Sequence, residues 1–312
     1  MSEFASVTFW TALVSGAILA GMPLLLAGLG ETIAERSGLL TIGLEGYMQF
    51  GGYVGFVAAL YSHSSAAGLL ASLGAGMAAS LIMLFLCVRW RVDQIVVGIG
   101  ILFLFEGITS VAQRAQFGTT YPRLGNVPTV KIPLLDRIPV LGSSLFSQPL
   151  VVYLSFVLVV VIWWVLKYTN VGLSLRAAGE RPEALDVSGV SVTKVRSIAA
   201  LITGALGGLG GGYMAIIGAG IFVPFMTHGA GFIAIVVAML GRGKPGLVVV
   251  GAFVFGLTVS VGTALQIVGV TISTDFINML PFLAVMLALV LLARRSALPA
   301  TLGIPYKREG QT

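Results

Sequence analysis

Apolar runs about as long as a membrane is thick dominate this sequence and restrict what it can fold into. A helix needs about 20 apolar residues to cross the hydrocarbon core of a bilayer, where every backbone polar group must be paired within the chain. The candidate segments are 8–30, 39–61, 66–88, 94–115, 148–167, 195–218, 229–241, 246–268 and 275–293. The sequence therefore predicts an all-α, polytopic membrane protein with about nine membrane segments, of which 229–241 is short or broken.

The composition agrees with lipid as the main solvent. Only 10% of the residues are charged and 57% are hydrophobic, whereas about 25% of a soluble domain is charged. The net charge of +6 comes from basic residues in short loops between the apolar runs, so it does not indicate nucleic-acid binding. We expect one membrane domain over residues 1–312, with lipid around it.

The basic residues also predict an orientation, because loops rich in lysine and arginine stay in the cytoplasm. With nine crossings, fourteen of them fall on one side: Arg36, Arg89, Arg91, Lys167, Arg176, Arg181, Lys194, Arg196, Arg242, Lys244, Arg294, Arg295, Lys307 and Arg308. Four fall on the other side: Arg114, Arg123, Lys131 and Arg137. This places the N-terminus outside and the C-terminus in the cytoplasm. The proline-containing segment 118–147 is expected as an ordered loop on the outer side.

The longest strongly polar interruption, residues 175–189, falls on the predicted cytoplasmic side. Pro182 suits the first turn of a helix, Glu183 favours the positive end of its dipole, and Gly189 is a typical stop. We predict a short cytoplasmic helix within about 180–189 whose small apolar surface is formed by Ala184, Leu185 and Val187. A solvated loop would explain the arginines of this stretch, but not a capped helix with an apolar side.

Two acidic residues lie inside predicted spans, where a charge costs about 2.5–3.5 kcal/mol and therefore suggests a function. Glu106 shares one helical face with Thr109, Ser110 and Gln113. This face could line a pathway or form a hydrogen-bond network between helices. Glu45 lies in a glycine-rich segment with Gln49 one turn later, and either contacts substrate or pairs structurally.

Further positions near the span ends and in the second half are weaker signals. Phe225 is a candidate for stacking on a planar ligand, or an ordinary aromatic residue at the membrane interface. Glycines 204, 208 and 212 are spaced by four, which favours close packing of helices over a role in ligand binding. The candidate pathway residues are Glu45, Gln49, Glu106, Ser110, Gln113 and Phe225.

The sequence lacks the common enzyme and metal signatures. It has no GxxxxGK[ST] phosphate loop, no GxSxG or HExxH motif and only two histidines, His63 and His228. We therefore expect neither an enzyme nor a metal site, and no cofactor bound by this chain. Any ATP hydrolysis that drives it must take place on another subunit.

At this point the chain resembles a known family. Residues 172–189, GLSLRAAGERPEALDVSG, resemble the cytoplasmic coupling segment of ABC importer permeases of the ribose and branched-chain amino acid type, G-x-x-L-R-A-x-G-x-N-x-x-A-A-x-x-x-G-I. Arg181 replaces the usual asparagine and Leu185 one alanine. Residues 35–46, ERSGLLTIGLEG, are similar to the pattern of the nucleoside branch, which is associated with basic membrane lipoproteins, although Thr41 stands where that branch has asparagine. The resemblance covers about residues 8–296.

The resemblance implies partners as well as a fold. A cytoplasmic ATP-binding subunit, with ATP and Mg, would dock on the coupling segment, an extracytoplasmic lipoprotein would deliver substrate, and a second permease, related or identical, would complete the membrane part. The residues so assigned to coupling are Gly179, Glu180, Arg181, Pro182, Glu183, Ala184, Leu185, Asp186 and Gly189. The implied location is a bacterial cell membrane.

Three functions follow from these expectations. The first is the permease subunit of an importer for nucleosides or related purine-like compounds. The second keeps the superfamily but has a simple sugar such as ribose as substrate. The third is a secondary transporter that uses Glu106 as a proton site.

Overall fold

The computed structural model describes residues 7–133, 140–267, 274–292 and 298–306. Its helices are α1 (Val7–Arg36), α2 (Leu44–Ser62), α3 (Ser65–Met83), α4 (Gln94–Phe117), α5 (Leu141–Leu145), α6 (Leu150–Tyr168), α7 (Asn170–Glu180), α8 (Pro182–Val187), α9 (Val192–Tyr213), α10 (Ala230–Gly241), α11 (Pro245–Ile267) and α12 (Thr274–Leu292). α3 and α9 each continue as a π-helical turn, Leu84–Arg89 and Met214–Ala219. Two short antiparallel strands, β1 (Thr129–Lys131) and β2 (Ser147–Pro149), complete the fold.

Six of the described helices are long and apolar enough to cross a membrane. These candidate spans are Phe9–Arg36, Ser65–Arg89, Gln94–Phe117, Leu150–Tyr168, Val192–Ala219 and Pro245–Gly262. Two apolar helical stretches are shorter, Ala230–Gly241 and Met279–Val290. The fold is therefore that of a polytopic helical membrane protein. The helix α2 is not among the six, although most of its residues are buried inside the bundle.

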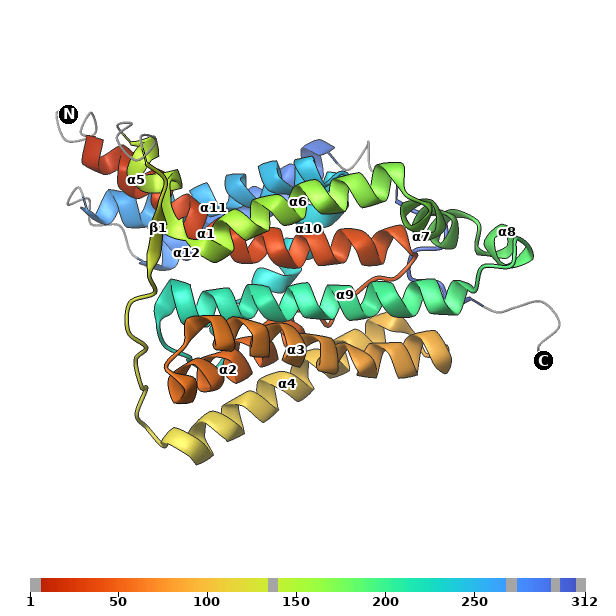
Figure 1. The fold of residues 1–312 in the computed structure, drawn as a ribbon, viewed down its shortest axis with the longest axis horizontal. Coiled ribbons are helices and arrows are strands. Elements are labelled where there is room, and N and C mark those ends of the chain that lie inside the picture. The colour runs from red at the N-terminus through yellow and green to blue at the C-terminus, as the bar shows by residue number, and fades with distance from the viewer. Residues whose placement is uncertain (1–6, 134–139, 268–273, 293–297, 307–312) are drawn as a thin grey trace.

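The helices α1 and α9 form the centre of the bundle (Figure 1). α1 packs against α9, α10 and α11, while α9 packs on its other side against α2 and α3. α4 lies along the outer side of α2, and α6 lies along α1 and α11. Because α2 is enclosed by α3, α4 and α9, it contacts protein more than lipid and tolerates polar residues that a lipid-facing helix would not.

The glycines of α9 allow this close packing. A Cβ atom at Gly211 would meet the backbone carbonyl of Met48 in α2, and one at Gly208 would meet the backbone of Ser72 in α3. Larger side chains at these positions would force the helices apart. The structure thus confirms that the regularly spaced glycines of α9 serve helix packing.

Two of the predicted spans are interrupted inside the bundle. The segment 39–61 is helical only from Leu44, and before it the Thr41 N–H donates a hydrogen bond to the Glu31 carboxylate of α1 at 2.9 Å. The short α10 has 12 residues, which corresponds to about 18 Å at about 1.5 Å per residue, well below the thickness of a membrane core. The predicted short or broken segment 229–241 is therefore confirmed as a short helix.

Other boundaries differ from the prediction. α1 continues to Arg36 instead of ending near residue 30, because the polar Glu31 and Glu35 are buried inside the protein and not exposed to lipid. The helix α7 precedes the predicted cytoplasmic helix and was not predicted; Thr169 is its N-terminal cap. In the segment 118–147 a strand is present, so the chain is not purely α-helical; β1 pairs with β2, and Val130 lies opposite Gln148. Residues 134–139, with Arg137, lie outside the described part.

Candidate functional site

The polar stretch between α6 and α9 forms α7 and α8 at one end of the bundle (Figure 1). Pro182 occupies the first turn of α8, where its missing N–H leaves no bond unmade. Gly189 has a φ of +86°, a left-handed conformation that glycine adopts without strain. The Val190 N–H then donates to the Leu185 carbonyl at 3.3 Å and closes the last turn. A proline and a glycine therefore set the two ends of α8.

Most of the predicted coupling residues are accessible. Gly179, Pro182 and Leu185 are buried, Asp186 is half-buried, and Glu180, Arg181, Glu183, Ala184 and Gly189 are exposed. Glu180 belongs to α7 and not to α8, so the short helix, Pro182–Val187, is shorter than the predicted range of about 180–189. Leu185 packs with Ala178 and Val192. Leu185 was predicted to form part of the small apolar surface of this helix, but its side chain packs inward; Ala184 and Val187 are exposed, Val187 to 89%.

A buried arginine fixes the position of α7 and α8. From α9, Arg196 donates hydrogen bonds to the carbonyl groups of Ser37 at 3.0 Å, Ala178 at 3.3 Å and Ile304 at 2.9 Å. It also donates to the Thr301 hydroxyl at 3.2 Å. One planar guanidinium thus joins α9 to the end of α1, to α7 and to the C-terminal residues. From the sequence, Arg196 was expected only as a basic residue near a cytoplasmic loop. Its role in joining these elements depends on contacts with residues that are distant in the sequence.

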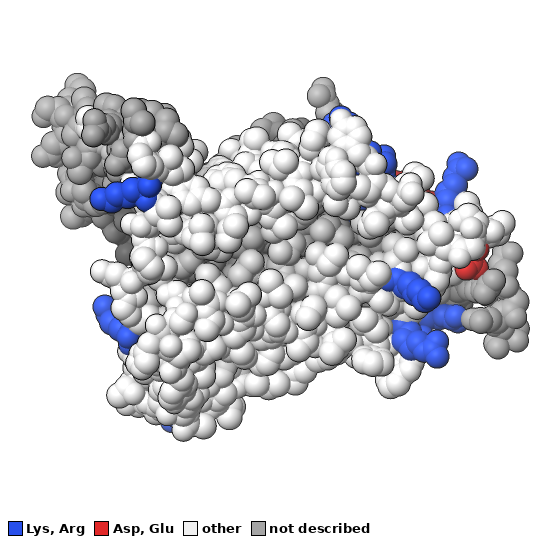
Figure 2. Space-filling view, in the orientation of Figure 1, with Lys and Arg blue, Asp and Glu red and all other residues white. Residues whose placement is uncertain are grey.

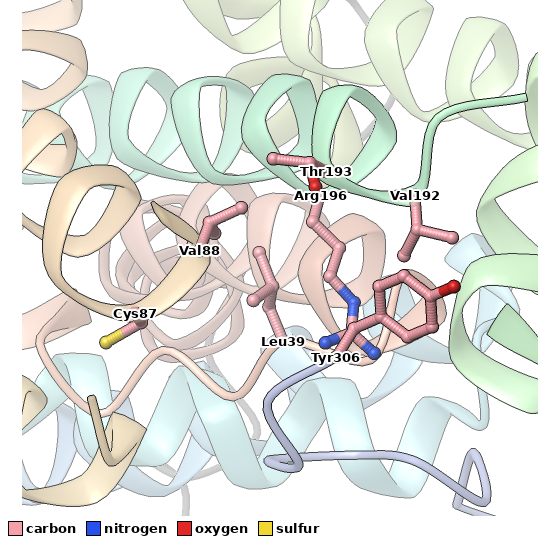
Figure 3. Close-up of a pocket in the computed structure, with 7 residues that line it drawn as sticks. All are labelled: Leu39, Cys87, Val88, Val192, Thr193, Arg196 and Tyr306. Carbon is pink, nitrogen blue, oxygen red and sulfur yellow. The ribbon is translucent and has the colours of Figure 1, made fainter. Parts of the chain in front are cut away.

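Residues 298–306, which we call the C-terminal clasp, complete this arrangement. The Thr301 N–H and hydroxyl donate to the Gly179 carbonyl at 3.0 and 2.8 Å, and the Gly303 N–H donates to the Gly38 carbonyl at 3.1 Å. Tyr306 lies beside the guanidinium of Arg196 (Figure 3). The cavity between them measures about 10 Å³. It has room for about one water molecule and is too small for a transported solute.

The starts of α2 and α10 meet inside the bundle, and Glu45 joins them. One carboxylate oxygen of Glu45 accepts the Gly229 N–H at 2.7 Å, and the other accepts the Gly231 N–H at 2.5 Å. These N–H groups belong to the first turn of α10, where the helix dipole is positive. A Cβ atom at Gly231 would lie 2.5 Å from the Glu45 nitrogen, so glycine is needed for this approach. These hydrogen bonds show structural pairing of Glu45; contact of Glu45 with substrate stays a prediction.

Gln49 lies one turn after Glu45 and is also fully buried. Its side-chain oxygen accepts a hydrogen bond from the Thr227 hydroxyl at 3.2 Å, whereas its nitrogen has no partner in the described chain. Thr227 was not predicted as a site residue, since a lone threonine near a glycine gives no signal in sequence. We call Glu45, Gln49, Thr227, Gly229 and Gly231 the helix junction.

The predicted polar face of α4 divides between two environments. Thr109 donates to the Phe105 carbonyl at 2.7 Å, and Gln113 is 2% exposed on the face that packs on α2. Both polar atoms of Gln113 and the Ser110 hydroxyl are buried, without a hydrogen-bond partner in the described chain. Buried polar atoms usually have partners, so these groups stay candidates for contact with a polar solute or with water.

The two remaining pathway candidates are more accessible. Glu106 is half-buried on α4. Phe225 is 50% exposed at a positive φ of 63°, in the turn that leads to Thr227. Phe225 is therefore not part of the buried helix junction, although it lies on the segment that enters it.

Buried acids of α1 escaped the sequence interpretation. Glu31 and Glu35 are 0% and 3% exposed and are one helical turn apart. One oxygen of Glu31 accepts the Thr41 N–H, and the other has no partner in the described chain. Their spacing was the available signal, but the polar sequence around them indicated a loop. Thr41, the residue that departs from the nucleoside pattern, is thus part of the α1–α2 connection.

The described residues hold no group of three or more histidine, cysteine or acidic side chains that could bind a metal ion. Positive side chains gather at both ends of the molecule, with an uncharged band between them on the face seen in Figure 2. The bundle therefore combines buried polar side chains inside it with a separate exposed helix, α8, at one end.

Comparisons with known proteins agree with this arrangement. The family model described as "Branched-chain amino acid transport system / permease component" matches residues 13–297. The guanosine ABC transporter permease protein NupQ of Bacillus subtilis is 33% identical, over 94% of this chain and 96% of its own length.

Two further relatives differ in the substrate that they are named for. The nucleoside ABC transporter permease protein NupC of Lactococcus lactis is 29% identical over the same shares, 94% and 96%. A protein of Haloferax volcanii, TsgC13, provisionally named as a glucose ABC transporter permease, is 33% identical over 80% of this chain and 77% of its own. No solved structure matches.

Proposed function

The chain belongs to the permease family of the branched-chain amino acid transport system, and we propose that it carries nucleosides or related purine-like compounds as the membrane subunit of an ATP-driven importer. The observation that carries this proposal is similarity over nearly the whole length to NupQ and NupC, which are named for guanosine and nucleosides. The glucose relative supports a sugar less, because its match covers a smaller share of both chains.

Membership in this family implies an ATP-binding subunit and a substrate-binding protein on other chains. We propose that the ATP-binding subunit, which holds ATP and Mg, docks on the exposed surface of α8 around Glu183, Ala184 and Val187. We further propose a related permease as the second membrane subunit and an extracytoplasmic lipoprotein as the substrate-binding protein. The presence of two guanosine permeases similar to this chain, NupQ and NupP, in Bacillus subtilis supports the related permease.

The proposed orientation places the N-terminus outside and the C-terminus in the cytoplasm of a bacterial cell. It is supported by the basic residues around α7 and α8, since lysine and arginine concentrate on the cytoplasmic side. On this orientation Phe225 and the turn before Thr227 approach the helix junction from the outside. The clasp and α8 lie at the inner end.

The proposed mechanism links α8 to the helix junction through the described contacts. Closure of the ATP-binding subunits would displace α8, and the Arg196 hydrogen bonds would pass this displacement to α1, α9 and the clasp. Because α1 packs against both α9 and α10, its movement would change the contact between the starts of α2 and α10. Gln49, Ser110 and Gln113, with Glu106 beside them, would contact the solute weakly as it passes.

The substrate is tested in proteoliposomes that contain the complete complex. We expect ATP-dependent uptake of radiolabelled guanosine, with competition by unlabelled adenosine but not by ribose or glucose. Competition by the sugars alone would show a sugar permease. Uptake driven by a pH gradient without ATP, and abolished by Glu106→Gln, would instead show the proton-coupled transporter.

The docking surface is tested separately by one exposed side chain. The change Val187→Asp alters a residue that is 89% exposed, so its effect on folding is small, within about 0.5 kcal/mol. We expect it to prevent copurification with the ATP-binding subunit and to abolish uptake. The matched control, Val130→Asp, is at an exposed position of β1 at the other end of the molecule. Normal association of the Val187 variant would contradict docking on α8.

A further inference from the structure

A groove with four basic residues opens beside α6, at the end of the molecule that carries α7 and α8. Its volume is about 450 Å³, and the basic residues that line it are Arg36, Lys167, Arg176 and Lys244. They come from α1, α6, α7 and the α10–α11 connection. None of the described lining residues is acidic. Four positive charges from four separate elements make a site for an anion, which the transport function does not use.

The remaining walls of the groove are apolar. Trp163 and Leu166 of α6 and Leu247 of α11 line it, and both helices are candidate membrane spans. Leu247 is 45% exposed and Trp163 is 42% exposed. The groove therefore lies where two spans end, with its apolar wall formed by side chains at the lipid boundary and its charged part towards α7. A tryptophan at this level is typical of the membrane interface.

The basic residues are held in place by the surrounding structure. Arg36 donates a hydrogen bond to the Gly243 carbonyl at 2.9 Å, which uses one of the five N–H groups of its guanidinium. The ammonium of Lys167 lies 5.2 Å from the ring centroid of Trp163 and 5.0 Å from that of Tyr168. These contacts orient two cations at low entropic cost. Glu180 of α7 and Glu35 of α1 both interact with Arg36 and offset part of the positive charge, which leaves four basic residues against two acidic ones.

We propose that this groove binds the phosphate headgroup of an anionic phospholipid from the leaflet on the α8 side of the membrane. The phosphate would lie among the four basic side chains, and the start of an acyl chain would lie against Trp163, Leu166 and Leu247. The combination of charge and apolar wall selects a lipid over free phosphate, because inorganic phosphate has no apolar group that could contact the wall. It also selects a lipid over a soluble protein, because the wall belongs to helices that are long and apolar enough to span the bilayer.

The groove lies at the same end of the molecule as the Arg196 contacts. Arg36 is the last residue of α1, and the Arg196 guanidinium bonds to the carbonyl of Ser37, the next residue. Arg176 belongs to α7, which is joined to the clasp through Gly179. A bound lipid would therefore hold the ends of α1, α6 and α7 together without contact to the solute path.

The test measures lipid retained by the purified full-length chain, by native mass spectrometry from neutral-detergent micelles containing phosphatidylglycerol or phosphatidylcholine. We expect preferential retention of phosphatidylglycerol. The double change Lys167→Gln with Lys244→Gln should weaken it about 25-fold, since each lysine near an anionic headgroup contributes about 1 kcal/mol. The matched control, Lys131→Gln with Lys194→Gln, removes the same charge at two exposed positions outside the groove and should leave retention unchanged.

Two further arms identify the source of the phosphate. Inorganic phosphate at the same concentration should not displace the lipid; displacement would show a free-anion site and overturn the lipid proposal. A photoactivatable phosphatidylglycerol analogue should label peptides from the end of α6 and the start of α11. Labelling elsewhere, or equal loss of retention in both double variants, would equally overturn it. Because labelling is done on the unaltered chain, a variant that fails to fold does not leave the question open.

Discussion

The side chain of Glu45 joins two helices that are far apart in the sequence. Its two oxygens accept N–H groups from Gly229 and Gly231, so it acts as the cap that the glycine-rich start of α10 lacks. A fixed carboxylate of this kind contributes to the structure before any solute arrives. Gln49 differs, because one of its polar atoms is unpaired in the described chain. Of these two neighbouring polar residues, Glu45 is fully paired, and Gln49 keeps one unpaired group that is a candidate for contact with a solute.

We expect Glu45→Gln to destabilise the protein by about 1–3 kcal/mol, because the amide keeps one acceptor and places its NH₂ group against a backbone donor. The measurement is thermal unfolding in detergent, followed by a maleimide dye that reacts with Cys87, the single cysteine of the chain, which is buried. The control Glu183→Gln, at an exposed position, should leave the unfolding temperature almost unchanged. Equal stability of both variants would contradict the capping role.

A second prediction at this scale concerns the glycines. Gly211→Ala should lower the free energy of unfolding by about 1–3 kcal/mol or more, because its Cβ would meet the Met48 carbonyl of α2. Gly107→Ala, in α4, meets nothing within 4 Å and should stabilise the helix by about 0.5–1 kcal/mol. The same Cys87 assay compares the two. A Gly211 variant as stable as the Gly107 variant would mean that α9 and α2 are farther apart than described.

At the scale of elements, most of the long apolar helices could be predicted from the sequence, whereas the end of α1 and the start of α2 could not. The apolar runs predicted α3, α4, α6 and α9 closely, because a long apolar segment in lipid must pair its backbone groups within one helix. The start of α2 and the end of α1 were missed, because each depends on the hydrogen bond between Thr41 and Glu31, which are placed together only by the turn between these helices. The pathway candidates were found by polarity, but which of them pair structurally depended on α10.

The Arg196 contacts give a prediction for α7 and the clasp. Arg196→Lys replaces a planar group with several donors by a single ammonium, which cannot reach Ser37, Ala178 and Ile304 at once. We expect hydrogen exchange in residues 177–190 and 299–304 to become about tenfold faster, a loss of about 1.4 kcal/mol of local stability. The exposed Arg181→Lys change should leave exchange there unchanged. Faster exchange limited to α9 would contradict a joining role.

For the whole molecule, the charge distribution predicts which surfaces are reachable from each side of the membrane. In a Cys87→Ser background, Thr119→Cys should react with a membrane-impermeant maleimide in intact cells. Ser188→Cys should react only after lysis. Both positions are exposed, so accessibility and not burial decides the result. Labelling of position 188 in intact cells would contradict the proposed orientation and indicate the opposite one.

The C-terminal clasp also determines when folding of this molecule can be completed during biosynthesis. Residues 299–304 are synthesised after α1 to α12, yet they supply hydrogen bonds to Gly38, near the end of α1, and to Gly179, at the end of α7. Every spanning helix can enter the membrane before these residues leave the ribosome, but the end of the bundle that carries α7 and α8 cannot close. Assembly with a partner that recognises the closed end would therefore be post-translational, and truncated chains would be distinguishable from complete ones at the membrane surface.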